Sequence, residues 1–254
     1  MTRFANRTQE LHLFQKMLGR QVSERILLIE APSGYGKTGL MGRFEILCSQ
    51  KIHPVLIDLK GAQTGIAFVF SRIQRVLGKE RFRNFNAQID RLFNSGVQIQ
   101  NNRLTGEGSQ IQVILDVPPE ERKYRLTQLQ QVFFEDLEKF DRPIAFILDT
   151  YNGATEELAG WIESPFLAEV ALNPKLFVIV AGQIIPQPTI EWQNLHHCCK
   201  LDRIMEREAW YGYVKDVGYC FSSEEIDFLI DAVGGVPAQV VLLLEGAART
   251  RQQI

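Results

Sequence analysis

The feature that most constrains the fold of this chain is a continuous apolar run that leads straight into a glycine-containing turn and a helical pattern. Residues 26–29 read ILLI, residues 31–38 read APSGYGKT, and residues 37–49 are predicted to form a helix. A strand that is apolar at every position is typical of a parallel sheet covered on both faces. This order of strand, turn and helix therefore predicts an α/β fold in which a helix N-terminus faces the turn.

Four more apolar runs alternate with helical patterns along the chain. Strands are predicted at 54–58, 144–148, 176–180 and 198–201, and further helices at 8–19, 65–77, 120–140 and 155–172. Strands that alternate with helices favour a doubly wound parallel sheet flanked by helices, with right-handed crossovers. From about residue 205 onward no buried strand is visible, which predicts a small C-terminal helical subdomain.

One stretch departs from this alternation. Residues 97–115, VQIQNNRLTGEGSQIQVIL, alternate apolar and polar residues on both sides of a turn that contains glycine. Alternation with a period of two is typical of strands that have one solvated face. We therefore predict an accessory β-hairpin at about 97–115, inserted between the second and third strands of the sheet.

The turn at 31–38 has the composition of a phosphate-binding loop. Gly34 and Gly36 supply conformational freedom, and the residues that follow can reach the β- and γ-phosphates (Lys37) and hold Mg²⁺ (Thr38). The usual pattern, G-x-x-x-x-G-K-[ST], has glycine where this chain has Ala31, and we interpret the added methyl group as a tolerated variant. A plain strand-to-helix turn is the alternative interpretation. The residues of the loop predicted to bind nucleotide are Ser33, Gly34, Tyr35, Gly36, Lys37 and Thr38.

A second signal of a nucleotide site is an acidic residue at the end of a later buried strand. In the segment IAFILDTYNG, Asp149 follows such a strand. Ligands of open α/β sheets bind at the carboxyl ends of the strands, so Asp149 and the loop at 31–38 are expected to converge. Asp149 and Thr38 are therefore the predicted Mg²⁺ ligands. A solvent-facing aspartate that caps a helix is the alternative.

The motifs FANRTQEL, APSGYGKT, FILDTY, FVIVAGQ and AVGGVPAQVVLLLE, in this order, resemble those of the STAND class of P-loop NTPases. That class includes the NB-ARC and NACHT modules and is related to the AAA+ ATPases. The resemblance extends from residue 4 to about 248 and implies a P-loop nucleotide-binding domain at 1–204 and a helical lid subdomain at 205–254. It also implies ATP or ADP with Mg²⁺ as the ligand and a nucleotide-dependent signalling switch as the function.

Two further motifs of the class assign residues of this chain to the nucleotide. An N-terminal box, h-x-[GN]-R-x-x-E-L, lies beside the adenine in that class. The residues that match this box are Phe4, Asn6, Arg7, Glu10 and Leu11. A Gly-x-Pro motif of the helical subdomain meets the nucleotide from the other side and is matched by residues 235–237. Because proline lacks an N–H and fixes φ, Pro237 suits a rigid helix start beside a ligand. The resemblance thus assigns nucleotide contacts to Arg7 and Pro237.

Two positions depart from the pattern of fast ATPases. Many relatives that hydrolyse ATP quickly have Asp or Glu directly after the metal-binding Asp, whereas this chain has Thr150, whose hydroxyl cannot act as a general base at neutral pH. Gln183 follows the strand at 176–180 and can hydrogen-bond to the γ-phosphate but not neutralise it. We therefore predict slow hydrolysis. Glu156 and Glu157 are alternative acids, although a helix N-terminus favours acids without any catalytic role. The predicted catalytic residues are Lys37, Asp149 and Gln183.

The expected partners follow from the same resemblance. The chain ends at Ile254 without the sensor or effector domains of the STAND class, so we expect either a fragment or protein partners that act in trans, or self-association. A non-hydrolysing ATP-binding scaffold and a DNA-associated AAA+ ATPase remain alternatives. A basic stretch at 72–91 includes Phe82 and Phe85 and is a candidate DNA contact, but a solvated helix face explains it as well. Because the net charge is −2, nucleic acid is not the expected partner.

Composition excludes several other classes of protein. No apolar stretch is long enough to span a membrane and no signal-peptide core follows Met1, so a cytoplasmic protein without membrane contact is expected. Four cysteines are too few for a disulfide scaffold of 254 residues. The run HHCC at 196–199 cannot easily close one metal tetrahedron, because alternate side chains of a strand point to opposite faces. We interpret this run as a buried strand end.

Overall fold

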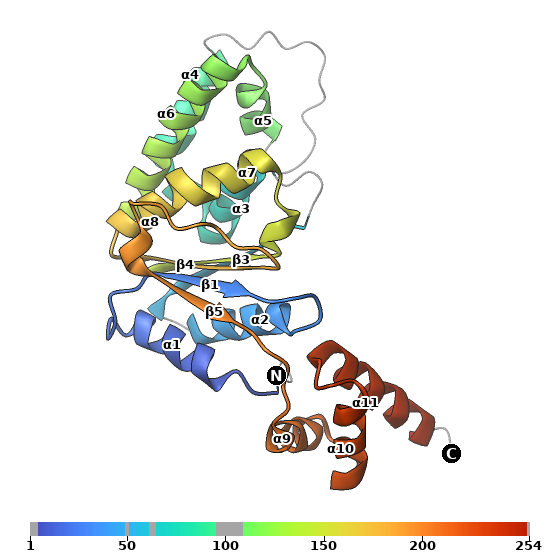
Figure 1. Cartoon of the computed structure of the whole chain (residues 1–254). Coiled ribbons are helices and arrows are strands. Elements are labelled where there is room, and N and C mark those ends of the chain that lie inside the picture. Colours follow the sequence, from blue (N-terminus) through green and yellow to red (C-terminus); the bar gives the residue numbers. More distant parts are fainter. Residues whose placement is uncertain (1–4, 49–50, 61–64, 95–108, 253–254) are drawn as a thin grey trace.

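The computed structural model describes residues 5–48, 51–60, 65–94 and 109–252 of the chain. In this part of the chain a five-stranded sheet has the order β2-β3-β4-β1-β5, and every neighbouring pair is parallel (Figure 1). The predicted strands are confirmed, most of them one or two residues longer than predicted. The strands are β1 (Ile26–Glu30), β2 (His53–Asp58), β3 (Ile144–Asp149), β4 (Leu176–Gly182) and β5 (His196–Lys200).

Helices cover both faces of the sheet, as predicted for a doubly wound fold. One face carries α1 (Thr8–Leu18) and α2 (Lys37–Cys48), which lie below the sheet in Figure 1. The larger layer lies on the opposite face. Its elements are α3 (Ile66–Leu77), η2 (Lys79–Arg81), α4 (Arg83–Asn94), α5 (Ser109–Leu115), α6 (Pro119–Glu138), η3 (Tyr151–Gly153), α7 (Glu156–Trp161), the π-helical η4 (Ile162–Phe166) and α8 (Leu167–Leu172).

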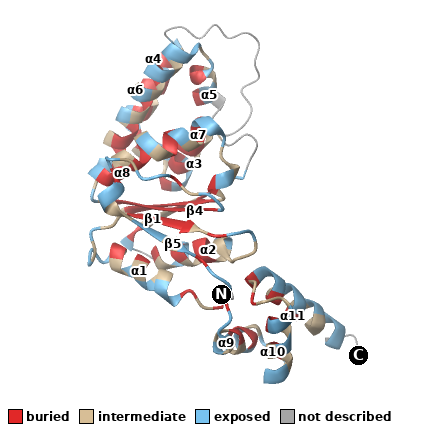
Figure 2. Cartoon of the chain, viewed as in Figure 1, coloured by how far each residue is buried: buried red, intermediate tan, exposed pale blue. Residues whose placement is uncertain are grey.

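The central strands alternate their side chains between two apolar cores. In β1, Ile26 and Leu28 join the core under the larger helical layer, whereas Leu27 and Ile29 join the core under α1 and α2. Figure 2 shows the central strands as a buried layer between the two helical layers, whereas β5 is exposed. Burial of every position explains why these strands read as uninterrupted apolar runs.

The C-terminal part of the chain is helical, as predicted. After η5 (Gln193–Leu195) and β5, it forms α9 (Arg207–Val217), α10 (Ser223–Ala232) and α11 (Pro237–Gln252). These three helices have a core of their own around Trp210. Ala5 and Ile204, from the other side of the predicted boundary, are also buried in this core. The division at 204/205 stays a prediction.

The predicted β-hairpin is wrong where the structure describes it. Residues 109–115 form helix α5, and residues 97–108 lie outside the described residues. The sequence SQIQVIL alternates, but it also carries Ile111, Ile114 and Leu115 at helical spacing. These three side chains are buried in the core, and α5 contacts α3, α4 and α6. Tertiary burial therefore selects the helical period over the strand period.

The interpretation of residues 196–199 as a buried strand end is also wrong. They belong to β5, which is the edge strand beside β1, and His197 and Cys198 are exposed. In β5 every position is intermediate or exposed, so neither face of this edge strand is buried as the faces of β3 and β4 are. Within the described part of the chain, no three His, Cys, Asp or Glu side chains form a group suited to a metal ion. No helix in that part has the length and hydropathy required to cross a bilayer.

Candidate functional site

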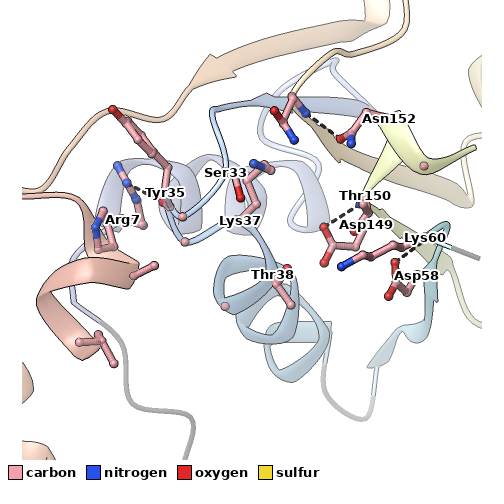
Figure 3. Close-up of a pocket in the computed structure, with 18 of the residues that line it drawn as sticks. Arg7, Ser33, Tyr35, Lys37, Thr38, Asp58, Lys60, Asp149, Thr150 and Asn152 are labelled. Carbon is pink, nitrogen blue, oxygen red and sulfur yellow. Dashed lines mark hydrogen bonds between the residues drawn. The ribbon is translucent and has the colours of Figure 1, made fainter. Parts of the chain in front are cut away.

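A pocket of about 640 Å³ opens at the carboxyl edge of the sheet (Figure 3). Its walls are the turn between β1 and α2, the ends of β2, β3 and β4, and the start of α11. The volume lies within the range of about 300–1,000 Å³ typical of small-molecule sites. Every residue predicted to contact nucleotide or metal lines this pocket. These residues are Arg7, Ser33, Gly34, Tyr35, Gly36, Lys37, Thr38, Asp149, Gln183 and Pro237.

The turn between β1 and α2 requires its two glycines. Gly34 and Gly36 have φ of +84° and +88°, a region that side chains with a Cβ rarely adopt. Ala31, where the usual pattern has glycine, is buried in the core under α2, and its N–H donates to the carbonyl of Gly182 at 3.1 Å. The methyl group of Ala31 therefore packs below the turn. Because it lies outside the pocket lining, it leaves the cradle open.

Lys37 spans the turn from the first position of α2. Its Nζ donates to the carbonyls of Ala31 at 2.7 Å and Pro32 at 2.8 Å. An ammonium has three N–H donors, so these two bonds leave one for a ligand in the pocket. Burial lowers the pKa of Lys37, while the charge of Asp149 acts in the opposite direction. The arrangement places a positive charge at the helix N-terminus, where backbone N–H groups also favour an anion.

Asp149 lies at the end of β3, only 4% exposed, and faces the start of α2 (Figure 3). One of its carboxylate oxygens accepts the N–H of Thr150 at 2.8 Å. Thr150 has φ of +59°, which is unusual for a β-branched residue. This backbone turns the chain sharply after β3 and fixes the Asp149 carboxylate at the pocket floor. Asp149 and Thr38 together offer hard oxygen donors, the ligands that Mg²⁺ prefers.

Arg7 connects three segments that are distant in the sequence. Its guanidinium donates to the carbonyls of Tyr35 at 3.0 Å and Asp202 at 2.6 Å, and burial lowers its pKa. Arg203 donates from Nε to the Tyr35 hydroxyl at 3.3 Å. The N-terminal segment, the glycine turn and the segment before α9 are thus held together at one side of the pocket. The contacts of Arg7 are with the protein backbone, and any contact with a nucleobase stays a prediction.

The helical subdomain closes the pocket at the start of α11. The N–H of Ala238 donates to the carbonyl of Gly34 at 2.9 Å, which joins α11 directly to the glycine turn. Pro237, the first residue of α11, lies buried beside this bond. Gly235 has φ of +68° and its carbonyl accepts the N–H of Ile204 at 2.9 Å. The turn before α11 is therefore fixed from both sides.

Glu156 and Glu157, the alternative catalytic acids, lie close to Asp149 in the sequence but outside the pocket. Glu157 forms an ion pair with Arg122 at 2.7 Å on the surface, and Glu156 is exposed in the first turn of α7. Neither residue is part of the pocket lining. Gln183 is exposed at the rim, and its N–H donates to the side chain of Asn152 at 3.0 Å.

Three polar residues of the pocket were missed by the sequence analysis: Asp58, Lys60 and Asn152. Asp58 ends β2 just as Asp149 ends β3, so an aspartate after an apolar run was also present in the segment VLIDLK. Lys60 follows β2 in a loop and Asn152 follows β3 in η3, and no pattern in the sequence distinguishes them from other polar residues that follow strands.

The basic stretch at 72–91 does not offer stacking side chains. Phe82 and Phe85 are completely buried in the core. Arg81 pairs with Asp141 at 3.1 Å and lies over the Phe140 ring at 3.8 Å. Base stacking, which supports many single-strand contacts, is therefore not available from these two phenylalanines. That nucleic acid is not a partner stays a prediction.

No family model and no curated protein matches the chain. Among solved structures, it is similar to a chain in the structure of Drosophila ORC bound to AT-rich DNA and Cdc6, with 10% identity and a TM-score of 0.45. The match covers 77% of this chain and 53% of that one, so this chain spans about half the length of that protein. Such a distant likeness carries no inference about function. What the described residues show is an α/β fold: a parallel sheet with helices on both faces, a glycine turn between β1 and α2, and an acid at the end of β3.

Proposed function

We propose that this chain binds ATP or ADP together with Mg²⁺ in the pocket at the carboxyl edge of the sheet. The observation that carries the proposal is convergence: ten residues predicted from five separate motifs line one pocket. A strand-to-helix turn without a ligand would not require Asp149 or Pro237 to lie beside it. The size of the pocket and its combination of a cation, carboxylates and apolar groups suit a nucleotide.

The phosphates are proposed to lie against the turn at 33–38. Backbone N–H groups of the turn and the N-terminus of α2 favour an anion there, and Lys37 adds a charge-assisted hydrogen bond. Thr38 and Asp149 are the proposed Mg²⁺ ligands, and the cation would offset the charge of the phosphates. The base and sugar are proposed to lie toward Ala5, Ile204 and Val241, which form an apolar part of the lining.

We further propose that the bound nucleotide controls the position of the helical subdomain, as in the switch proteins of the STAND class. The direct bond between Ala238 and Gly34 supports this proposal, because it ties α11 to the turn that would hold the phosphates. Thr150 in place of an acid and Gln183 in place of a cation favour slow hydrolysis. Thr150 equally favours a second candidate, a scaffold that binds ATP without hydrolysing it.

The substitution Asp149→Asn tests the proposed metal site. Removing one charge beside the cation should weaken Mg²⁺-ATP binding by roughly 1.5–3 kcal/mol, or about ten- to a hundredfold, and metal-free ATP binding much less. Titration calorimetry with and without Mg²⁺ measures both affinities. Glu156→Gln is the matched control, because it removes an exposed carboxylate outside the pocket. If Asp149→Asn weakens both forms of ATP equally, Asp149 has no role as a metal ligand.

A further inference from the structure

Two strands that are far apart in the sequence end in aspartate at the same level of the sheet. Asp58 of β2 is the register partner of Asp149 of β3, and the N–H of Leu59 donates to the carbonyl of Asp149 at 2.9 Å. Neighbouring strands lie about 4.8 Å apart, and register partners in a parallel pair point to the same face. Figure 3 shows both carboxylates on the side of the pocket where α2 begins.

The two carboxylates have different surroundings. Asp149 is buried at the pocket floor, whereas Asp58 is exposed in the pocket wall. The Oδ1 of Asp58 accepts the backbone N–H of Lys60 at 2.9 Å, which favours one orientation of the side chain. A carboxylate can accept about four hydrogen bonds, so this bond leaves acceptor positions for water. The buried carboxylate of Asp149 suits a metal ion, whereas the exposed carboxylate of Asp58 can accept a hydrogen bond from a water molecule.

The other acids near the site are excluded by their positions. The residue after Asp149 is Thr150, which carries no carboxylate, and Glu157 is paired with Arg122 outside the pocket. Among the described residues that line the pocket, carboxylates occur only at Asp58 and Asp149. With Asp149 assigned to Mg²⁺, Asp58 is the one described pocket residue left to act as a base.

We propose that Asp58 is the catalytic base that orients and deprotonates the water attacking the γ-phosphate, an inference that rests on the proposed function. The water oxygen forms a bond to the γ-phosphorus as the bond from that phosphorus to the β–γ bridging oxygen breaks. The electron pair of the broken bond stays on the β-phosphate, which leaves as ADP. The water proton passes to the Asp58 carboxylate and then to solvent, and inorganic phosphate is the second product.

The substitution Asp58→Asn tests this role in the full chain. Asparagine keeps an Oδ1 that can accept the N–H of Lys60, so a merely structural role would survive the change. We expect single-turnover hydrolysis of γ-labelled ATP to fall by about 10²-fold or more, the usual contribution of a general base. Mg²⁺-ATP affinity should stay within about threefold. Glu156→Gln, an exposed acid of α7 outside the pocket, should change neither quantity.

A second variant, Asp58→Glu, keeps a carboxylate and should retain more activity than Asp58→Asn, which also guards against a folding defect. Equal hydrolysis by Asp58→Asn and the unmodified chain would overturn the inference, as would a matched loss of Mg²⁺-ATP affinity. If the unmodified chain binds Mg²⁺-ATP but releases no phosphate, Asp58 is not a base and the binding proposal stands. If the unmodified chain does not bind ATP at all, the proposed function fails and this inference fails with it.

Discussion

At the scale of single residues, the backbone is strained at Thr150, directly after the proposed metal ligand Asp149. Thr150 adopts φ of +59°, and its N–H fixes the carboxylate of Asp149. A left-handed conformation costs a residue with a Cβ about 1–2 kcal/mol, so the surrounding structure must stabilise it. The same position is where fast ATPases that resemble this chain carry an acid. Strain and the missing acid thus coincide at one residue.

Hydrolysis by the unmodified chain should be far slower than the enzyme median of about 10 per second, with single turnovers taking minutes or longer. Thr150→Glu should raise this rate, because it returns a carboxylate next to the metal-binding Asp149. The new side chain is not β-branched, so it fits φ of +59° with no more strain than threonine. Steady-state phosphate release and ATP affinity are the two measurements. Unchanged affinity with a faster rate is the expected outcome; an unmodified chain that already turns over several times per second would refute slow hydrolysis.

At the scale of secondary-structure elements, burial on both faces decided what the sequence could predict. The strands and most helices followed from apolar runs and helical spacing, since residues 26–29 of β1 are all apolar and match no amphipathic helix. The prediction for residues 109–115 was wrong because their apolar residues fit both the period of a strand, two, and the period of a helix, 3.6. Contacts with α4 and α6 favour the helix. Helix α4 was not predicted: the stretch at 72–91 was interpreted as a solvated helix face, and only packing shows that Phe82 and Phe85 face inward.

The residues of the pocket also differ in whether the sequence alone could identify them. Lys37 and Asp149 follow from local motifs, and Arg7 and Pro237 follow from a family resemblance. Asp58 depends on the register of β2 with β3, which pairs strands about ninety residues apart and which no local pattern encodes. An aspartate at the end of an apolar run was visible in both cases. Only the sheet shows that the two lie side by side.

The turn before α11 gives a test at this scale. A Cβ added at Gly235 would lie 2.7 Å from the Ile204 carbonyl oxygen and 2.5 Å from the sulfur of Met205. Gly235→Ala should therefore lower the free energy of unfolding by about 3 kcal/mol, from left-handed strain together with overpacking. Gly218→Ala is the matched control, because Gly218 also has positive φ but no atom within 4 Å of the added Cβ. It should cost about 1–2 kcal/mol.

Urea unfolding followed by circular dichroism measures both variants. Equal losses for Gly235→Ala and Gly218→Ala would mean that the close approach to Ile204 does not restrict this turn. A larger loss for Gly235→Ala would support a rigid connection between the helical subdomain and the segment before α9.

At the scale of the whole molecule, specific hydrogen bonds join segments that are distant in the sequence around the pocket. Ala238 bonds to Gly34, and Arg7 bonds to Tyr35 and Asp202. Each of these contacts ends on the backbone of the glycine turn or of the segment before α9. A ligand that orders the turn would therefore also order the start of α11, which is the physical basis of the proposed switch.

Hydrogen exchange should detect this coupling. With Mg²⁺-ADP at a hundredfold excess over its Kd, openings that destroy the site become less favourable by about 2.7 kcal/mol, which slows their exchange about a hundredfold. We expect this protection in the glycine turn and in the first turn of α11. Helix α4, which lies in the other helical layer and lines no part of the pocket, is the internal control. Protection of the glycine turn without protection of α11 would contradict a nucleotide-dependent switch.

The central claim is that the turn at 31–38 holds the phosphates of a nucleotide, and the affinity of Lys37→Ala for ATP tests it most directly. The substitution removes a charge-assisted bond of roughly 1.5–3 kcal/mol, so calorimetry should show ATP binding weakened about ten- to a hundredfold. Lys79→Ala removes an exposed lysine that is not part of the pocket lining and should bind as the unmodified chain does. If Lys37→Ala binds ATP as tightly as the unmodified chain, the phosphates do not lie on this turn and the account is wrong.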